Sequence, residues 1–207
     1  MRPTATKEKI FDATIALVSE KGYLGATTRE IARRAGVTEL TLFRHFGSKE
    51  NLFELTLESH SFLPDLREIL PDLKDLTYED ALQTLGKRFL LSLKARKPMV
   101  LIMQAEMTRY PGKMKRMYGQ LMDEMLGTLA TYFVALQKKG SLRHFPAELA
   151  ARMFLGMLFS YFRTEEIMRG TDITKGGRMD AAVKGVVDIF IHGTVAVKNG
   201  TLKRRRT

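Results

Sequence analysis

The stretch TTREIARRAGVTELTLFRHFGSKENL, residues 27–52, contains the start and stop signals of two short helices. Thr27 followed by Glu30 is typical of a capping box, in which the hydroxyl accepts from the third helical amide and the carboxylate returns to the amide of the cap. A helix is therefore expected to begin at Thr28. Gly36 can adopt the left-handed conformation that ends a helix at little cost, so this helix is predicted to stop there.

A second helix is predicted directly after the glycine, because Thr38 can cap a helix that runs to about Phe46. Its inward face is expected to place Leu42 and Phe46 against Ile31, Ala35 and Val37. Its outward face then carries Thr38, Glu39, Leu40, Thr41 and Arg44. Two short helices joined by a glycine-containing turn form the helix-turn-helix unit, whose second helix can lie in the DNA major groove.

The outward side chains suit contacts with base edges. Arg44 can donate to guanine O6 and N7, and Glu39 can accept from cytosine N4. Leu40 or the methyl group of Thr41 can touch a thymine methyl group. These four residues are the predicted base-reading set.

Other polar side chains of the stretch suit phosphate oxygens. They are the threonine hydroxyls, His45 and Lys49, and Lys49 lies at a predicted helix N-terminus, where amides and the helix dipole also favour an anion. Taken alone, a histidine such as His45 is more often a surface or half-buried side chain than a phosphate ligand. A capped helix pair also occurs in many all-α proteins that bind no DNA.

The whole chain is predicted to be all-α, because almost every segment has a helical period and no run alternates as a strand would. About nine helices are expected. Residues 1–50 form the predicted DNA-binding domain, with a fourth helix at 48–63 as connector, and residues 65–207 form a larger C-terminal domain. In that domain helices are expected at about 78–95, 98–109, 112–139, 146–169 and 176–197.

Residues 27–52 resemble the DNA-binding domain of the TetR (tetracycline-repressor-like) family of bacterial transcriptional repressors, through the pattern TT-x-x-x-I-A-x-x-A-G-V-T-x-x-x-L-F-x-H-F-x-S-K-x-x-L. The resemblance implies a homodimer that binds a palindromic operator and is released by a small molecule in the C-terminal domain. It also implies that Thr27 or Thr28, Thr38, His45 and Lys49 contact phosphates, while Glu39, Leu40, Thr41 and Arg44 face bases.

Phe43 departs from this family, in which many members have a tyrosine whose hydroxyl bonds a phosphate. Phe43 cannot form that bond, although its ring can still pack against the sugar-phosphate backbone. The loss is expected to cost about 1 kcal/mol of binding free energy. Leu40 is also bulkier than the residue often found at that position, so the operator cannot be copied from relatives.

The last two predicted helices carry more apolar surface than one core contact requires. Ten of the thirteen residues from Ala150 to Phe162 are apolar, which indicates a helix buried nearly all round. The family pairs these helices in a four-helix dimer interface, and the predicted interface residues are Met153, Gly156, Ser160, Ala182, Gly185 and Ile189. The alternative is that both helices form the centre of a monomeric bundle.

Methionines are concentrated in the middle of the chain, seven of twelve between Met99 and Met125. A methionine stripe is commonly core, but methionine also lines adaptable binding surfaces. Because the resemblance requires an effector pocket, the predicted lining residues are Phe89, Leu93, Met103, Met107, Met125, Leu129 and Phe159. An apolar effector, such as a fatty acyl group, a drug or an aromatic compound, fits such walls.

The formal net charge of +11 supports a polyanionic partner and equally fits a well-solvated basic surface. The C-terminal Lys-Arg-Arg-Arg is expected to be solvated, with DNA contact as the alternative. Charged residues of the C-terminal domain are expected to be solvated or ion-paired, although one arginine could bind an acidic head group; they include Arg109, Arg163, Glu165, Glu166 and Arg169.

An enzyme is not expected, because the chain has no cysteine, no Glu-x-x-His pair, no glycine-rich phosphate loop and no serine nucleophile motif. No cofactor and no metal ion are expected. No apolar run is long enough to span a membrane, and no signal segment precedes the first helix, so a cytoplasmic protein is predicted. A helical scaffold that has lost DNA affinity is the remaining alternative.

Overall fold

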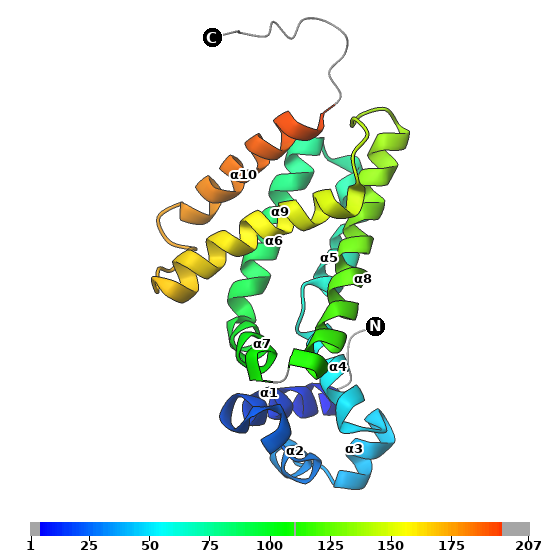
Figure 1. Cartoon of the computed structure of the whole chain (residues 1–207), viewed down its shortest axis with the longest axis vertical. Coiled ribbons are helices and arrows are strands. Elements are labelled where there is room, and N and C mark those ends of the chain that lie inside the picture. The colour runs from blue at the N-terminus through cyan, green and yellow to red at the C-terminus, as the bar shows by residue number, and fades with distance from the viewer. Residues whose placement is uncertain (1–4, 110, 196–207) are drawn as a thin grey trace, which may run out of the picture. The chain divides into compact units, whose positions relative to one another are not determined.

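A computed structural model describes residues 5–109 and 111–195, and the described residues form ten α-helices, one 3₁₀-helix and one π-helix (Figure 1). The all-α prediction is therefore confirmed. The N-terminal helices are α1 (Ala5–Gly25), α2 (Thr28–Ala35), α3 (Glu39–Phe46), α4 (Lys49–Ser59) and α5 (Leu63–Ile69). The later helices are α6 (Tyr78–Ala95), α7 (Lys97–Arg109), α8 (Pro111–Lys138), α9 (Ala147–Phe162) and α10 (Arg178–Thr194).

The region between the predicted domains contains a helix that was not expected from the sequence. Helix α4 ends at Ser59, short of the predicted 63, and α5 follows at Leu63–Ile69, with a 3₁₀-helix at Asp72–Asp75. Pro64 lies in the first turn of α5, where a missing amide hydrogen costs nothing. Pro64 therefore marks a helix start here, which makes ten α-helices in the described residues instead of about nine.

The chain divides into two compact units. Unit 1 consists of Met1–Asp65 and Leu91–Met125, and unit 2 consists of Leu66–Leu90 and Leu126–Thr207. The division after Leu90 falls inside the long helix α6, and the division after Met125 falls inside the long helix α8. The expected domains, 1–50 and 65–207, stay a prediction, and a helix shared by two compact units carries no turn signal in its sequence.

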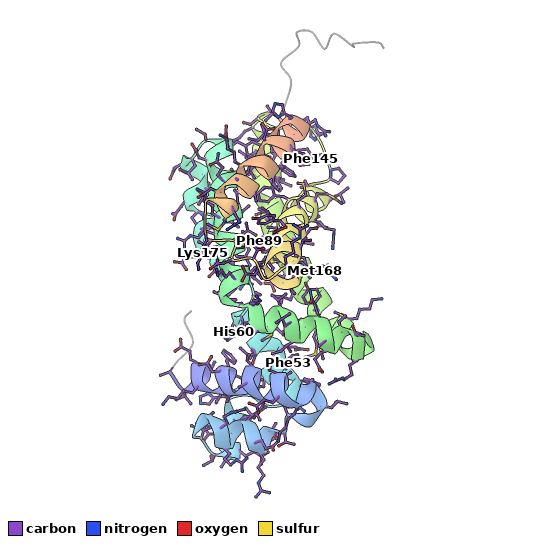
Figure 2. All side chains as sticks on the ribbon, turned by 90° about the vertical axis from the view of Figure 1, so that its left-hand side faces the viewer. Phe53, His60, Phe89, Phe145, Met168 and Lys175 are labelled. Carbon is purple, nitrogen blue, oxygen red and sulfur yellow. The ribbon has the colours of Figure 1, made fainter. Side chains whose placement is uncertain are left out.

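The core of unit 1 joins the helix-turn-helix to α7 and the start of α8. Helix α1 packs against α2, α4 and α7. Most of the methionine stripe belongs to this core, since Met99, Met103, Met114 and Met117 are buried with the apolar residues of α1 to α4. Phe53, labelled in Figure 2, packs against Tyr23 with the two rings tilted and their centroids 4.9 Å apart. These four methionines therefore have a core position, which was the alternative to lining a binding surface.

The core of unit 2 is built on aromatic rings from three helices. Phe190 of α10 lies 5.7 Å from Phe133 of α8 and 5.2 Å from Phe154 of α9, measured between ring centroids. Phe145, labelled in Figure 2, extends the cluster at 6.2 Å from Phe133. Gly86 of α6 lets α10 approach closely, because a Cβ there would lie 3.0 Å from the Val183 side chain.

The predicted helix at 146–169 is formed by two elements. Helix α9 ends at Phe162 and continues as a π-helix, Arg163–Met168. Within that segment the buried carboxylate of Glu166 accepts a hydrogen bond from the Ile173 amide at 3.1 Å, which fixes the connection to α10. No helix in the described part of the chain is long and apolar enough to cross a membrane.

Candidate functional site

The α2 and α3 pair has the predicted caps and turn. The Thr27 hydroxyl accepts from the Glu30 amide at 3.2 Å, and the Thr38 hydroxyl accepts from the Thr41 amide at 3.1 Å. Gly36 ends α2 in the left-handed conformation, with φ 70° and ψ 31°. The Val37 amide then donates to the Ala32 carbonyl at 3.0 Å, which closes the turn.

Helix α3 buries one face and exposes the opposite one. Leu42 and Phe46 are buried in the unit 1 core, as predicted. On the opposite face Leu40 is 79% exposed and Phe43 is 42% exposed. Arg44 is also exposed and has no ion pair or side-chain hydrogen bond among the described residues. Leu40, Phe43 and Arg44 are called the outward trio below.

Two side chains predicted to face outward are only half-exposed, because they bond to neighbours within unit 1. The Glu39 carboxylate accepts a hydrogen bond from the Thr28 hydroxyl at 2.6 Å, which connects α3 to α2. The Thr41 hydroxyl lies 2.8 Å from the Thr38 hydroxyl. Glu39 precedes Leu42 and Phe46 on the inward side of the helix, so it meets α2 before it can meet DNA.

The threonines at the start of α2 have already used their hydroxyl hydrogens. Thr27 donates to the Glu30 carboxylate at 3.1 Å, and Thr28 donates to Glu39. A threonine hydroxyl has a single hydrogen, so neither side chain has a donor left for a phosphate. The first amides of α2 have no partner within the helix and are aligned with its dipole, which makes backbone contact with a phosphate the available alternative.

Lys49 starts α4 and is anchored to the end of α1. Its Nζ donates to the Leu24 carbonyl at 3.2 Å and lies 4.7 Å from the centroid of the Tyr23 ring. An ammonium group has three hydrogens, so this anchor is compatible with a further contact to phosphate. His45 is half-buried at the end of α3, with its ring 6.0 Å from that of Phe46.

Ion pairs neutralise an acidic side chain of α1 and one of α2. Lys21 lies 2.5 Å from Glu30, and Arg34 lies 2.8 Å from Glu20. The hydrogen bond from Arg34 lowers the pKa of Glu20, and the bonds from Lys21 and then Thr27 lower the pKa of Glu30. Both carboxylates therefore stay ionised and paired near neutral pH.

Two arginines outside the predicted DNA-contact residues are exposed on α2. Arg29 and Arg33 are four residues apart, and neither side chain has a polar partner among the described residues. Together with Arg44 they are the unpaired cations of the helix pair. The i, i+4 spacing of Arg29 and Arg33 is visible in the sequence. The sequence does not show that Arg34 is paired with Glu20 while Arg29 and Arg33 have no such partner among the described residues.

The seven predicted effector-lining residues are divided between the two units. In unit 2, Phe89 (labelled in Figure 2) and Leu129 are buried and Phe159 is half-buried. In unit 1, Met103 and Met125 are buried, and Leu93 and Met107 are half-buried. Met103 belongs to the core cluster with α1 to α4. The proposed lining therefore stays a prediction.

The predicted dimer residues lie on the outer faces of α9 and α10. Met153 is 52% exposed and Ile189 is 66% exposed, although both are large and apolar. The other exposed members are Gly156, Ser160 and Gly185, and Ala182 is half-buried. These faces therefore lie outside the core of unit 2.

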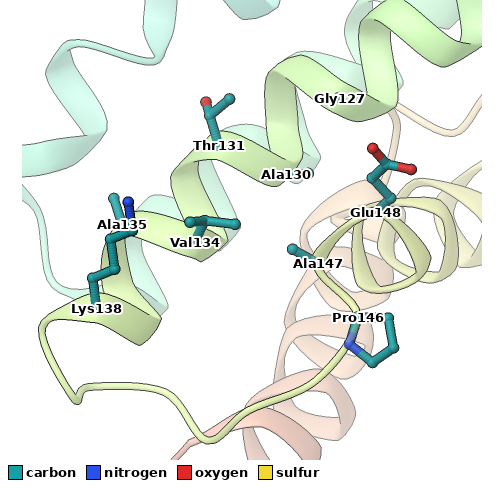
Figure 3. Close-up of a pocket in the computed structure, with 9 residues that line it drawn as sticks. All are labelled: Gly127, Ala130, Thr131, Val134, Ala135, Lys138, Pro146, Ala147 and Glu148. Carbon is teal, nitrogen blue, oxygen red and sulfur yellow. The ribbon is translucent and has the colours of Figure 1, made fainter.

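An open groove of about 690 Å³ lies between α8 and the start of α9 in unit 2 (Figure 3). Small side chains of α8 line one wall, and Lys138 and Glu148 carry opposite charges at its rim. Its lining residues are Gly127, Ala130, Thr131, Val134, Ala135, Lys138, Pro146, Ala147 and Glu148. None of the seven predicted effector residues lines this groove. The described residues contain no group of histidine and carboxylate side chains arranged to hold a metal ion.

The sequence matches two family models. Residues 10–56 match the model described as "Bacterial regulatory proteins, tetR family". Residues 80–193 match the model described as "AefR-like transcriptional repressor, C-terminal domain". The two matches cover the helix-turn-helix with α1 and the helices from α6 to α10.

Relatives of known sequence agree with these matches. The uncharacterized HTH-type transcriptional regulator YvkB of Bacillus subtilis (strain 168) is 32% identical over 164 residues, which cover 78% of this chain and 82% of YvkB. IcaR of Staphylococcus aureus (strain Newman), the HTH-type negative transcriptional regulator of the biofilm operon icaADBC, is 40% identical over 52 residues, which cover 25% of this chain and 28% of IcaR.

Solved structures share the fold. A protein of Mesorhizobium loti MAFF303099, described as a TetR-family transcriptional regulator, superposes with a TM-score of 0.74 at 25% identity, covering 94% of this chain and all of the other. FadR of Bacillus subtilis, solved in complex with stearoyl-CoA, superposes with a TM-score of 0.70 at 19% identity, covering 90% of this chain and 98% of FadR. The protein therefore belongs to the TetR family of helix-turn-helix transcriptional regulators, which bind DNA and are not enzymes.

Proposed function

We propose that the protein is a cytoplasmic repressor that binds a palindromic operator as a homodimer and is released by a small, mostly apolar effector. The observation that carries the DNA-binding part is the outward trio on α3, exposed from a helix that is capped and turned as a helix-turn-helix requires. Repression is supported by the similarity of residues 80–193 to the AefR-like repressors and by the negative regulator IcaR among the relatives.

The dimer is proposed to form through the outer faces of α9 and α10. Exposed Met153 and Ile189 would be covered in it, and Gly156 and Gly185 would let two helices approach closely. A two-fold axis would also present two α3 helices to the two halves of a palindrome. Two predicted residues complete the proposed interface, Ser160 and Ala182.

Light scattering of the intact protein tests the dimer. We expect twice the chain mass for the wild type and one chain mass for Ile189→Glu, because a carboxylate would be buried without a partner. Leu101→Glu, at an exposed leucine of α7, is the matched control and should stay dimeric. A monomeric wild type, or an unaffected Ile189→Glu dimer, would overturn the proposed interface.

The effector is proposed to be a fatty acyl compound. FadR, which shares this fold, was solved with stearoyl-CoA, and the proposed lining is apolar and sulfur-rich. Phe159 is its half-buried member in unit 2, which leaves part of the ring accessible. The other proposed lining residues are Phe89, Leu93, Met103, Met107, Met125 and Leu129.

Selection of bound sequences from a random DNA pool tests the proposed function. A DNA reader should enrich a palindrome and should lose affinity steeply as salt rises, because phosphate contacts release counterions. A helical scaffold would enrich no sequence. A thermal-shift series with stearoyl-CoA, and with free coenzyme A as control, tests the effector: stearoyl-CoA should raise the unfolding temperature and release the operator. If neither compound does so, the fatty acyl assignment fails while operator binding stands.

A further inference from the structure

The outward trio places two apolar side chains and one cation on the exposed face of α3. Leu40 and Phe43 are three residues apart, and Leu40 and Arg44 are four apart, so the three lie side by side on one face of the helix. Leu40 is 79% exposed, the largest exposed fraction among the large apolar side chains of the described residues. A recognition helix normally presents hydrogen-bonding groups to base edges, so this composition requires an explanation.

The polar side chains that flank the trio are engaged inside the protein. The Glu39 carboxylate accepts from the Thr28 hydroxyl at 2.6 Å. The Thr38 and Thr41 hydroxyls lie 2.8 Å apart, and the Thr41 amide donates to Thr38. These bonds hold α2 and the start of α3 in place, and breaking them to read a base would cost what the base contact gains. Arg44 is left as the polar side chain of this face without a partner among the described residues.

We propose that Leu40 reads the C5-methyl group of a pyrimidine, so that each half of the operator is recognised through a thymine methyl group beside the base that Arg44 contacts. The inference rests on the proposed operator binding and names the chemistry of that site. Thymine presents a methyl group in the major groove, and cytosine presents none at that place. A leucine pressed against that methyl group removes apolar surface of both partners from water.

Phe43 supports this contact from the same face. Its ring is 42% exposed and lies one turn from Leu40, so it extends the apolar surface and helps to exclude water from it. The consequence is a base preference that depends on a methyl group and not on a hydrogen bond. Deoxyuridine has the same hydrogen-bonding edge as thymidine and lacks the methyl group. Replacing thymidine by deoxyuridine therefore distinguishes recognition through the methyl group from recognition through a hydrogen bond.

The experiment uses the intact protein and the operator recovered by selection. Each thymine is replaced in turn by deoxyuridine, symmetrically in both halves, and the dissociation constant is measured at one salt concentration. We expect one position at which the loss is about fourfold for each methyl group removed, the equivalent of one buried methylene, and therefore roughly 15-fold for the symmetric pair. Deoxyuridine at other positions should leave the affinity unchanged.

Leu40→Ala identifies the side chain that reads the methyl group. This variant should bind the thymine operator more weakly and should no longer distinguish thymine from deoxyuridine at the sensitive position. Leu101→Ala, at an exposed leucine of α7, is the matched control and should keep the full distinction. Because Leu40 is exposed, the variant should unfold at the wild-type temperature, which a thermal melt verifies.

The outcomes separate the two proposals. If the wild type binds a palindrome but tolerates deoxyuridine at every position, methyl reading is wrong and operator binding stands. If Leu40→Ala keeps the deoxyuridine penalty, Leu40 is not the reader and the inference fails. If no sequence is enriched in the selection, the proposed operator binding fails and the inference falls with it.

Discussion

The buried carboxylate of Glu106 on α7 accepts a hydrogen bond from the backbone amide of Tyr23 on α1, at 2.9 Å. The bond lies at the break in α1, where Gly22 has φ 73° and ψ 169°. Glu106 is 2% exposed, and the Arg109 guanidinium lies 3.6 Å from its other oxygen. Helix α7 lies in the region matched by the C-terminal family model, and α1 lies in that matched by the N-terminal one. This contact therefore joins the two family regions inside unit 1.

Removal of the Glu106 carboxylate should destabilise the protein. Glu106→Ala leaves the Tyr23 amide without its acceptor, so the free energy of unfolding should fall by about 1 to 3 kcal/mol. Glu106→Gln keeps an acceptor oxygen and should lose less. Urea unfolding measures both, and Glu54→Ala, at an exposed glutamate of α4, is the control. An equal loss in Glu106→Ala and Glu54→Ala would contradict a stabilising role for the bond.

A side chain at Gly22 should disturb the same contact. A Cβ there would lie 2.9 Å from Arg109 Nη1 and 3.1 Å from Glu106 Oε1, and the backbone conformation is one that glycine alone adopts easily. Gly36 also has a positive φ, but a Cβ there would meet nothing within 4 Å. Gly36→Ala should therefore cost about 1 to 2 kcal/mol of unfolding free energy from backbone strain alone, and Gly22→Ala should cost more. Equal losses would mean that the Arg109 and Glu106 side chains of α7 move away from the added Cβ at no cost in free energy.

His60 should make stability fall as the pH is lowered. Burial lowers the pKa of His60 in the folded protein, and its ring packs edge-on against Phe11 with centroids 6.1 Å apart. As the pH falls through about 6.5, the unfolded chain takes up a proton at this histidine before the folded protein does. The free energy of unfolding therefore decreases with falling pH until the lower folded pKa is passed. The contribution is fully present above that range.

The groups that face His60 shift its pKa in opposite directions. Its Nδ1 lies 3.1 Å from the Thr56 carbonyl and its Nε2 lies 3.9 Å from Asp12, and both favour the proton, whereas the charge of Arg96 opposes it. Urea unfolding at about pH 7.5 and 5.5 should show a smaller pH effect for His60→Gln than for the wild type. His144→Gln, at an exposed histidine, should keep the wild-type difference.

Arg44 and Lys49 should affect DNA binding in different ways. Arg44→Ala should cost about 1 to 3 kcal/mol for each half of the operator and relax the preference at one base pair in each half, because a base contact is lost there. Lys49→Ala should weaken binding on all sequences and reduce the salt slope by about one for each protomer of the dimer, because a phosphate contact is lost in each half of the operator. Equal weakening by Arg44→Ala on every sequence, or an unchanged slope for Lys49→Ala, would rule out the respective role.

Phe43→Tyr should restore a phosphate contact. The ring is exposed on the outward trio, so an added hydroxyl meets no core atom. Affinity should rise on every sequence by about fivefold for each protomer, the equivalent of one hydrogen bond of about 1 kcal/mol, and therefore roughly 25-fold for the dimer. Gel-shift titrations on the operator and on unrelated DNA measure this, and a rise on the operator alone would indicate a base contact instead.

The sequence predicted the caps and turn of the helix pair correctly because each signal acts over a few residues. Thr27 with Glu30 and Thr38 with Thr41 are each three residues apart, and both pairs form the expected cap bond. The burial of Leu42 and Phe46 followed from helical periodicity in the same way. The fold class and the candidate DNA surface could therefore be predicted.

Contacts between distant residues were decided by the tertiary structure. Thr28 engages Glu39 across the turn, Lys49 reaches the Leu24 carbonyl, and Glu106 meets Tyr23 over 83 positions of sequence. Such pairs depend on the angles at which helices pack, and helical periodicity carries no information about those angles. The methionine stripe faced the same limit, because a methionine fits a core and a pocket equally well. The sequence by itself thus determined the fold class, the helix-turn-helix pair and the inward face of α3, whereas packing decided which polar groups on its outward face remain free to meet DNA.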